Sequence, residues 1–87
     1  MNYYVYLIIS KRNNSYISYV GYTNNIKKRI NMHNESKGAK FTRGNKWELI
    51  YKESYKTKSS AMTAEYKLKK NYHLRKKIKN NFIYKWK

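Results

Sequence analysis

The first quarter of the chain contains two runs of β-branched and aromatic residues separated by a polar break. The runs are residues 3–9 and 16–22, and the segment 10–15 between them carries Ser, Lys, Arg and Asn. Runs of this composition favour β-strands, and a short polar break between them is typical of a hairpin. The pattern therefore predicts a β-hairpin over residues 3–22.

From Asn24 onward the apolar spacing becomes that of a helix. Ile26 and Ile30 recur four positions apart, a polar residue among 23–25 can cap the start, and Asn34 lies near the expected end. Residues 35–46 hold Ser, Gly, Lys, Thr and Arg without periodicity, which predicts a basic loop. A third strand is predicted at residues 47–51, where Trp, Leu, Ile and Tyr are concentrated.

The last third of the chain predicts two further helices. The first can be capped by Ser59 or Ser60, and the second starts near Leu74 and carries Ile78 and Phe82. The apolar face of the first consists of Ala61, Ala64, Leu68 and Tyr72. The expected fold is therefore α+β, a three-stranded antiparallel sheet flanked by helices in the order ββαβαα. No linker-like stretch divides the chain, so residues 1–87 are expected to form a single domain.

The charge balance is extreme. The 87 residues include 21 Lys and Arg but only 4 Asp and Glu, which gives a formal charge of +17. Such a potential attracts polyanions, of which nucleic acid is the most abundant in a cell. Apolar residues at 40% and aromatic residues at 17% exceed what a disordered basic tail carries. The composition therefore predicts a folded domain that binds nucleic acid.

Several classes of protein are disfavoured by what the sequence lacks. It has no Cys, which removes disulfide frameworks, thiolate zinc sites and thiol nucleophiles and favours a reducing compartment. The apolar run at residues 3–9 is too short to span a bilayer, and neither a basic region before it nor a cleavage site after it suggests a signal peptide. An intracellular protein is expected, neither secreted nor inserted in a membrane. Binding of the Tyr-rich run to a membrane surface is disfavoured, because its pattern is that of a buried strand.

Four side chains are brought together by simple geometry. If the hairpin pairs residues whose numbers sum to an odd value, Tyr6 and Tyr19 lie on the same face of the sheet, opposite or diagonal to each other. Arg29 and His33 are four apart on the predicted helix and flank its apolar stripe, so both turn toward the sheet. Taken singly, each has an ordinary alternative: packing for a tyrosine, a buried hydrogen bond for His33, and a solvated charge for Arg29.

Glu65 is the fifth candidate. It is one of only four carboxylates and falls on the apolar side of the predicted second helix, near Ala61 and Leu68. A carboxylate at the edge of a core must be paired or must bind a metal ion. Both alternatives are open, because a bridge to Arg29 or to a lysine is as reasonable here as a metal ion.

The set taken together resembles the GIY-YIG nuclease family. Tyr4-Val5-Tyr6 stands where the family has Gly-Ile-Tyr, with Tyr4 in place of the glycine, and Tyr19-Val20-Gly21 stands where it has Tyr-Ile-Gly. The segment 38–44, Gly-Ala-Lys-Phe-Thr-Arg-Gly, looks like a loop of the small stand-alone branch, which is related to the catalytic subunit of structure-specific Holliday-junction nucleases. The resemblance covers residues 3–75. It implies an endonuclease that hydrolyses phosphodiester bonds in DNA, in repair or recombination.

The resemblance also implies a role for each candidate residue. Arg29 would hold the scissile phosphate, and Tyr6 and Tyr19 would line the nucleophilic water and the phosphate. His33 would accept or relay the proton that one phenol takes from the water. Glu65 would be the single protein carboxylate on a Mg²⁺ ion, with Mn²⁺ as the alternative ion. A neighbouring Arg and a metal ion would be needed to make a phenolate accessible near neutral pH.

Basic residues of the loop and the second helix are candidates for binding the DNA backbone. They are Lys37, Lys40, Arg43, Lys67, Lys69, Lys70 and Arg75. No separate recognition domain is apparent, so the expected substrate is recognised by its structure, with branched DNA as a candidate, or through a homodimer or a partner protein. The competing hypothesis is a non-catalytic or partner-dependent module of the same fold that binds DNA or RNA without cutting it.

Overall fold

The predicted hairpin is present as β1 (Tyr3–Arg12) and β2 (Ser15–Thr23) in the computed structural model, which describes residues 2–85. The chain reverses at Asn13, whose φ of 56° is the left-handed conformation that tight hairpin turns require and that Asn tolerates. The strands pair with odd sums, Tyr6 opposite Gly21 and Ile8 opposite Tyr19. Tyr6 and Tyr19 are therefore diagonal neighbours on one face, as predicted.

A third strand, β3 (Glu48–Tyr55), pairs antiparallel with the other side of β1, so the sheet order is β2-β1-β3. An irregularity of register between Leu7 and Ile8 affects this pairing and not the hairpin. β3 continues four residues beyond the predicted end, because its polar second half still pairs with the start of β1. Trp47, predicted to begin the strand, lies in the loop before it.

The helices follow the predicted order ββαβαα, and their N-caps explain where they begin. The Asn25 side chain accepts a hydrogen bond from the backbone of Lys28, and Thr57 does the same for Ser60, so the predicted caps Ser59 and Ser60 lie inside the second helix. The helical elements are α1 (Ile26–Asn34), the short 3₁₀ helix η1 (Lys40–Thr42), α2 (Lys58–Lys70) and α3 (Tyr72–Lys85).

Two boundaries differ from the sequence prediction. η1 forms inside the segment predicted to be irregular. α3 begins two residues earlier than predicted, because the Asn71 side chain accepts a hydrogen bond from the backbone N–H of Leu74 and caps the new helix. Tyr72 is therefore part of α3 and 58% exposed, and its assignment to the apolar face of the preceding helix was wrong.

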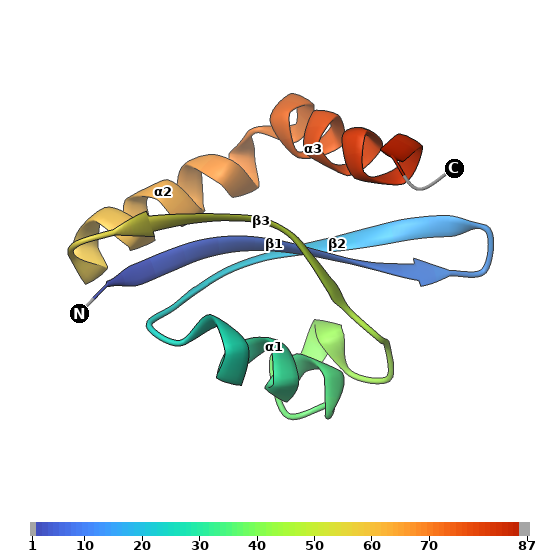
Figure 1. The fold of residues 1–87 in the computed structure, drawn as a ribbon, viewed down its shortest axis with the longest axis horizontal. Coiled ribbons are helices and arrows are strands. Elements are labelled where there is room, and N and C mark those ends of the chain that lie inside the picture. Colours follow the sequence, from blue (N-terminus) through green and yellow to red (C-terminus); the bar gives the residue numbers. More distant parts are fainter. Residues whose placement is uncertain (1, 86–87) are drawn as a thin grey trace.

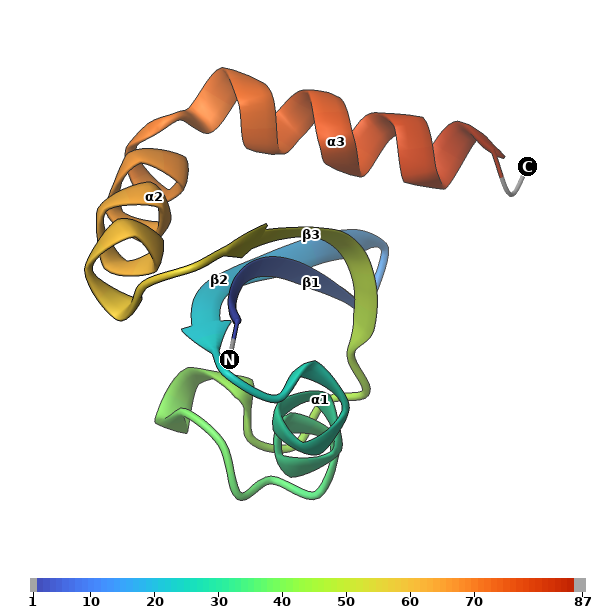
Figure 2. The ribbon, with the colours of Figure 1, turned by 60° about the vertical axis from the view of Figure 1, so that its left-hand side comes forward.

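The sheet separates two layers of helices, as Figures 1 and 2 show: α1 and η1 lie on one face, and α2 and α3 on the other. The central strand β1 is buried on both faces, which explains why its sequence is apolar without alternation. Val5 and Leu7 pack toward α2 together with Leu68, whereas Tyr6 and Ile8 pack toward α1. No helix within residues 2–85 is long and apolar enough to cross a membrane.

Candidate active site

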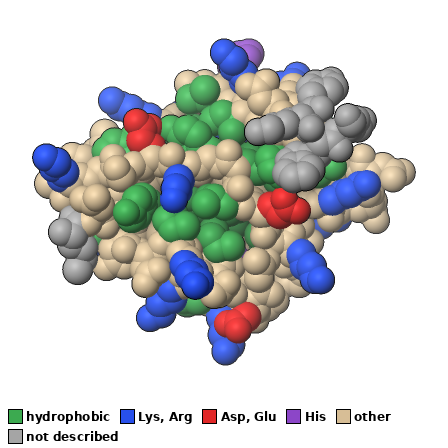
Figure 3. All heavy atoms as spheres, viewed as in Figure 1, with side chains coloured by type: hydrophobic (Ala, Val, Ile, Leu, Met, Phe, Trp, Pro, Cys, Tyr) green, Lys and Arg blue, Asp and Glu red, His purple; other side chains and the backbone are tan. Residues whose placement is uncertain are grey.

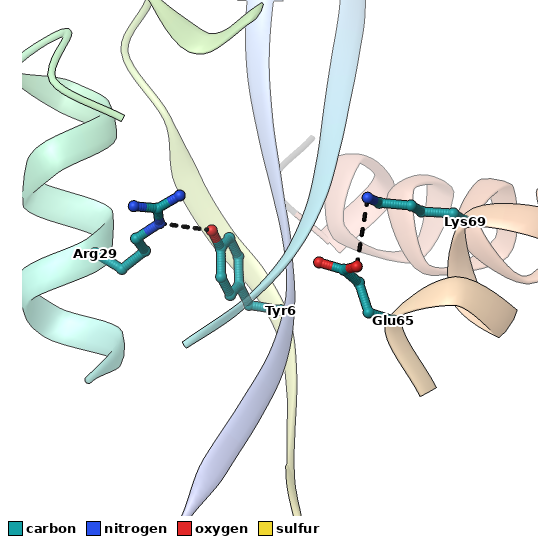
Figure 4. Close-up of polar contacts among 4 residues, drawn as sticks. All are labelled: Tyr6, Arg29, Glu65 and Lys69. Atoms are coloured by element: carbon teal, nitrogen blue, oxygen red, sulfur yellow. Dashed lines mark hydrogen bonds and ion pairs between the residues drawn. The ribbon is translucent and has the colours of Figure 1, made fainter. Parts of the chain in front are cut away.

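Four of the five residues singled out from the sequence line one cavity of about 460 Å³ beside the end of the edge strand β2. Figure 4 shows three of them: Arg29 extends from α1 and Glu65 from α2, with Tyr6 of β1 between them. Arg29 and Glu65 thus approach from opposite layers of the fold. This β2-edge cavity is lined by Tyr3, Tyr6, Tyr19, Gly21, Tyr22, Thr23, Asn24, Arg29, Lys58 and Glu65.

The position of Tyr6 depends on the glycine opposite it in the hairpin. The phenol ring lies directly over Gly21, so closely that a Cβ atom at position 21 would collide with the ring and its hydroxyl oxygen. Only glycine leaves this space, and it does so here by lacking a side chain rather than through an unusual backbone conformation. Gly21 therefore allows Tyr6 to reach the cavity wall from the central strand.

His33 lies behind Tyr6 rather than in the cavity. Its side chain is fully buried, and its Nε2 atom is 2.8 Å from the Tyr6 hydroxyl. The other ring nitrogen, Nδ1, is 2.9 Å from the hydroxyl oxygen of Thr42 in η1. Gly38 packs so closely against the imidazole that a side chain there would clash with it. The loop at residues 38–44 therefore closes over His33.

The hydrogen-bond chain fixes where the protons are. A carbonyl can only accept, so the Thr42 hydroxyl must donate its proton to the Ala39 carbonyl oxygen, 2.8 Å away. The Thr42 oxygen then accepts from Nδ1–H of His33, and Nε2 of the neutral imidazole is left as an acceptor. Tyr6 consequently donates its proton to Nε2, while its oxygen accepts from Nε–H of Arg29 at 3.4 Å.

The ionisation of these groups follows from burial and from Arg29. Burial raises the pKa of Tyr6, and the hydrogen bond and positive charge of Arg29 oppose this rise without reversing it. Burial, and secondarily the charge of Arg29, lowers the pKa of His33. The hydrogen bond to Tyr6 raises the pKa of Arg29, which stays charged. Near neutral pH the Tyr6 phenol is thus neutral and donates its hydrogen bond to the neutral imidazole of His33. Arg29 alone does not produce the accessible phenolate considered from the sequence.

Glu65 forms the opposite wall, with a side chain only 19% exposed. Its carboxylate pairs with Lys69 at 3.4 Å, one turn further along α2 (Figure 4), so the lysine bridge considered from the sequence is present. Lys69 is 51% exposed, and a pair of this kind is worth only about 0.3–0.5 kcal/mol. The pairing is therefore weak enough to be exchanged for another cation.

The donor set suits a hard divalent cation held only partly by protein. Within residues 2–85 no group of three or more His, Cys, Asp or Glu side chains could enclose an ion. Mg²⁺ is commonly bound by one or two carboxylates together with water and substrate phosphates. Glu65, alone in a solvent-open cavity, fits this second mode.

The predicted DNA-contacting residues are spread over several surfaces. Lys69 and Arg75 line a hollow next to the β2-edge cavity. Lys37, beyond the end of α1, lines a hollow along that helix, and Lys67 lines two hollows with Tyr55 and Ala64. Lys70 lies over the exposed ring of Tyr66, and Lys40 and Arg43 are exposed in and after η1. Figure 3 shows Lys and Arg side chains distributed around an apolar central area of one face. Whether these residues bind DNA stays a prediction.

Sequence reasoning missed several residues that shape the site. Thr42 sets the tautomer of His33, Gly38 makes room for its ring, and Lys58 at the start of α2 lines the cavity. Thr42 and Gly38 belong to the 38–44 segment, whose resemblance to a family loop was a usable signal. From that segment only the family resemblance and the charges of Lys40 and Arg43 were used, so its contacts with His33 were overlooked.

Comparison with known proteins gives a family match over nearly the whole chain. The GIY-YIG catalytic domain model matches residues 2–84. The UPF0213 protein YazA of Bacillus subtilis is 41% identical over 78 residues, which cover 88% of this chain and 77% of that protein. A UPF0213 protein of Bacillus licheniformis is 45% identical over 83 residues, or 94% of this chain and 80% of that protein.

A solved structure is also similar. The solution NMR structure of a UPF0213 protein from Bacillus halodurans is 35% identical, covers 94% of this chain and 85% of that chain, and has a TM-score of 0.48. The names of these relatives specify neither a substrate nor a metal ion.

Proposed function

This chain belongs to the GIY-YIG family, whose catalytic domains are nucleases, and from that membership we propose a divalent-metal-dependent DNA endonuclease that recognises DNA structure rather than sequence. One observation carries the proposal. Tyr6, Tyr19, Arg29 and Glu65 come from four different elements and line a single cavity. A fold needs no such convergence for its stability, whereas phosphodiester hydrolysis needs a phosphate binder, a proton acceptor and a cation site in one place.

Arg29 is the group that binds the scissile phosphate. Its Nε–H donates to Tyr6, which orients the guanidinium, and the planar, permanently charged head suits two phosphate oxygens at once. As negative charge grows on the phosphate in the transition state, Arg29 offsets it without moving. Tyr19, which lines the cavity on the neighbouring strand, confines the attacking water and the phosphate on that side.

Tyr6 and His33 move the proton. The Tyr6 oxygen takes a proton from the attacking water while its own proton passes along the 2.8 Å hydrogen bond to Nε2 of His33. The lowered pKa of His33 keeps Nε2 unprotonated and ready to accept at neutral pH. Thr42 accepts the hydrogen bond from Nδ1–H and so holds the ring in the receptive tautomer. His33 acts through Tyr6 and does not itself reach the cavity.

Glu65 would hold a Mg²⁺ ion, or Mn²⁺ in its place, after release from Lys69. When bound, the ion would supply positive charge to the phosphate and the departing oxygen. The chain's own contribution is to place one carboxylate on the wall across from Arg29, so that the phosphate is bound from two sides.

The test is a cleavage panel of flapped, branched and linear DNA with Mg²⁺, with Mn²⁺ and with a chelator. We expect metal-dependent cleavage, greater on flapped or branched DNA, that is strongly reduced by Glu65→Gln and reduced about 10²- to 10³-fold by Arg29→Ala. Glu48→Gln and Lys28→Ala change exposed residues of the same charge and should cleave like the parent. Salt-sensitive DNA binding without metal-dependent cleavage of any substrate would instead identify a non-catalytic binding module and overturn the proposal.

A further inference from the structure

A second hollow adjoins the β2-edge cavity on the far side of Tyr19. It measures about 280 Å³, and we call it the Phe41 hollow; it is lined by Ser18, Tyr19, Val20, Phe41, Lys69 and Arg75. Tyr19 lines both cavities, and Lys69 of the hollow pairs with Glu65 of the β2-edge cavity. A nucleic-acid strand bound at the first cavity can therefore extend directly into the second.

Phe41 gives the hollow an exposed aromatic surface. Its ring stacks on Tyr19 with 6.2 Å between centroids and 21° between planes, and it lies 6.3 Å from the buried ring of Trp47. Tyr19 in turn contacts the ring of His33, so Phe41 is the solvent end of a row of rings that begins in the core. Phe41 is nevertheless 54% exposed. Exposing about half of a phenylalanine forfeits about half of the free energy that its full burial would provide.

Two cations, Lys69 and Arg75, line the same hollow as Phe41. The Arg75 side chain is held over the end of α2, because its Nε–H donates to the Leu68 carbonyl at 3.1 Å and Nη2 donates to the Lys69 carbonyl at 3.2 Å. The guanidinium is thus fixed at the hollow rather than free in solvent, and Lys69 stands beside it. An aromatic ring rimmed by fixed positive charge is the combination that binds single-stranded nucleic acid, through base stacking and phosphate contacts.

We propose that the Phe41 hollow binds an unpaired nucleobase next to the scissile phosphate, stacked on Phe41, with the adjoining phosphate on Lys69 and Arg75. The inference rests on the proposed nuclease function, because it takes the scissile phosphate to lie in the β2-edge cavity. It narrows the substrate class to DNA in which a strand leaves the duplex beside the cut. A base inside an intact duplex cannot stack on Phe41, since its neighbours already cover both of its faces.

The test places the fluorescent base 2-aminopurine at the first unpaired positions of a flapped DNA. Binding is measured with the Glu65→Gln protein in the presence of a chelator, so that cleavage plays no part. In this background we expect binding to quench the fluorescence. Adding Phe41→Ala should remove that quenching and lower the affinity for flapped DNA about 5- to 150-fold. Affinity for uninterrupted duplex should be unchanged, because those contacts are to phosphates.

Matched variants separate stacking from other roles of the ring. Phe41→Trp should retain the quenching, because it keeps an aromatic face, whereas Phe41→Leu, apolar but without one, should behave like Phe41→Ala. Tyr66→Ala removes a similarly exposed aromatic ring on α2, outside the hollow, and should bind like the parent. Thermal unfolding of each variant establishes that it is folded.

Two results would overturn the subsite. One is that Phe41→Ala quenches the fluorescence as strongly as the background protein. The other is that Phe41→Leu keeps both the full affinity and the full quenching. Either of them together with normal metal-dependent cleavage would refute the subsite and leave the nuclease function standing. Phe41-dependent quenching in a protein whose parent cleaves nothing would support the base-binding hollow while refuting the nuclease function.

Discussion

Replacing Thr42 with valine removes the hydroxyl that orients His33 while nearly preserving the shape of the side chain. Nδ1–H of His33 then faces a methyl group in a position with no exposure to solvent. The Ala39 carbonyl keeps a partner, because the backbone N–H of residue 42 also donates to it at 3.0 Å. The substitution therefore orphans one buried donor.

An unsatisfied buried donor costs about 1–3 kcal/mol, so we expect Thr42→Val to lower the free energy of unfolding by that amount. For a domain of this size each kcal/mol corresponds to about 4–8 °C in Tm. Thr42→Ser keeps the hydroxyl and loses one buried methyl, about 0.8 kcal/mol, and serves as the matched control. Urea unfolding of the three proteins gives the stabilities.

Imidazole ¹⁵N chemical shifts report the tautomer directly. In the parent and in Thr42→Ser the proton should reside on Nδ1, whereas in Thr42→Val the population with the proton on Nε2 should rise. Cleavage should fall as that population rises, because Nε2–H cannot accept the Tyr6 proton. If Thr42→Val is as stable as Thr42→Ser and the imidazole keeps its proton on Nδ1, the assigned hydrogen-bond chain is wrong.

Three further outcomes follow from the same site. Because the pKa of His33 is lower in the folded protein, the unfolded chain binds this proton first on acidification. The contribution of His33 to the free energy of unfolding should therefore be constant above about pH 6.5 and fall below it, and urea unfolding of His33→Gln should lack this fall. Gly21→Ala should displace the Tyr6 ring at a cost of about 1–3 kcal/mol and slow single-turnover cleavage, and equal stability and rate would contradict the packing seen here. Lys69→Gln frees Glu65, so with saturating DNA a Mg²⁺ titration should reach half-maximal cleavage at a lower concentration than in the parent. A higher Mg²⁺ concentration would mean that the pairing does not compete with the metal ion.

The parts of the fold that follow local rules were predictable from the sequence. The two apolar runs gave the hairpin, the odd-sum pairing placed Tyr6 and Tyr19 on one face, and the four-residue spacing turned Arg29 and His33 toward the sheet. Strand pairing and helical periodicity determine these features, and both are visible in the order of residues.

What could not be predicted depends on contacts between distant segments. The polar residues at 52–55 show no strand pattern of their own and are held extended by pairing with β1. Arg29 was an alternative to a lysine as the partner of Glu65, and its contact with Tyr6 instead depends on how α1 packs on the sheet. The contact of Thr42 with His33 depends on how the 38–44 loop folds back over α1, and the balance that raises the pKa of Tyr6 depends on burial.

The central claim, that Arg29 and Glu65 act on one phosphate in one cavity, is tested most directly by the single-turnover cleavage rates of a double-mutant cycle. The four proteins are the parent, Arg29→Ala, Glu65→Gln and the double variant, measured on one flapped DNA with saturating Mg²⁺. Groups that act as a unit are non-additive, so the double variant should be little slower than the slower single variant. Losses that simply multiply, or a single variant that cleaves at the parental rate, would contradict the account.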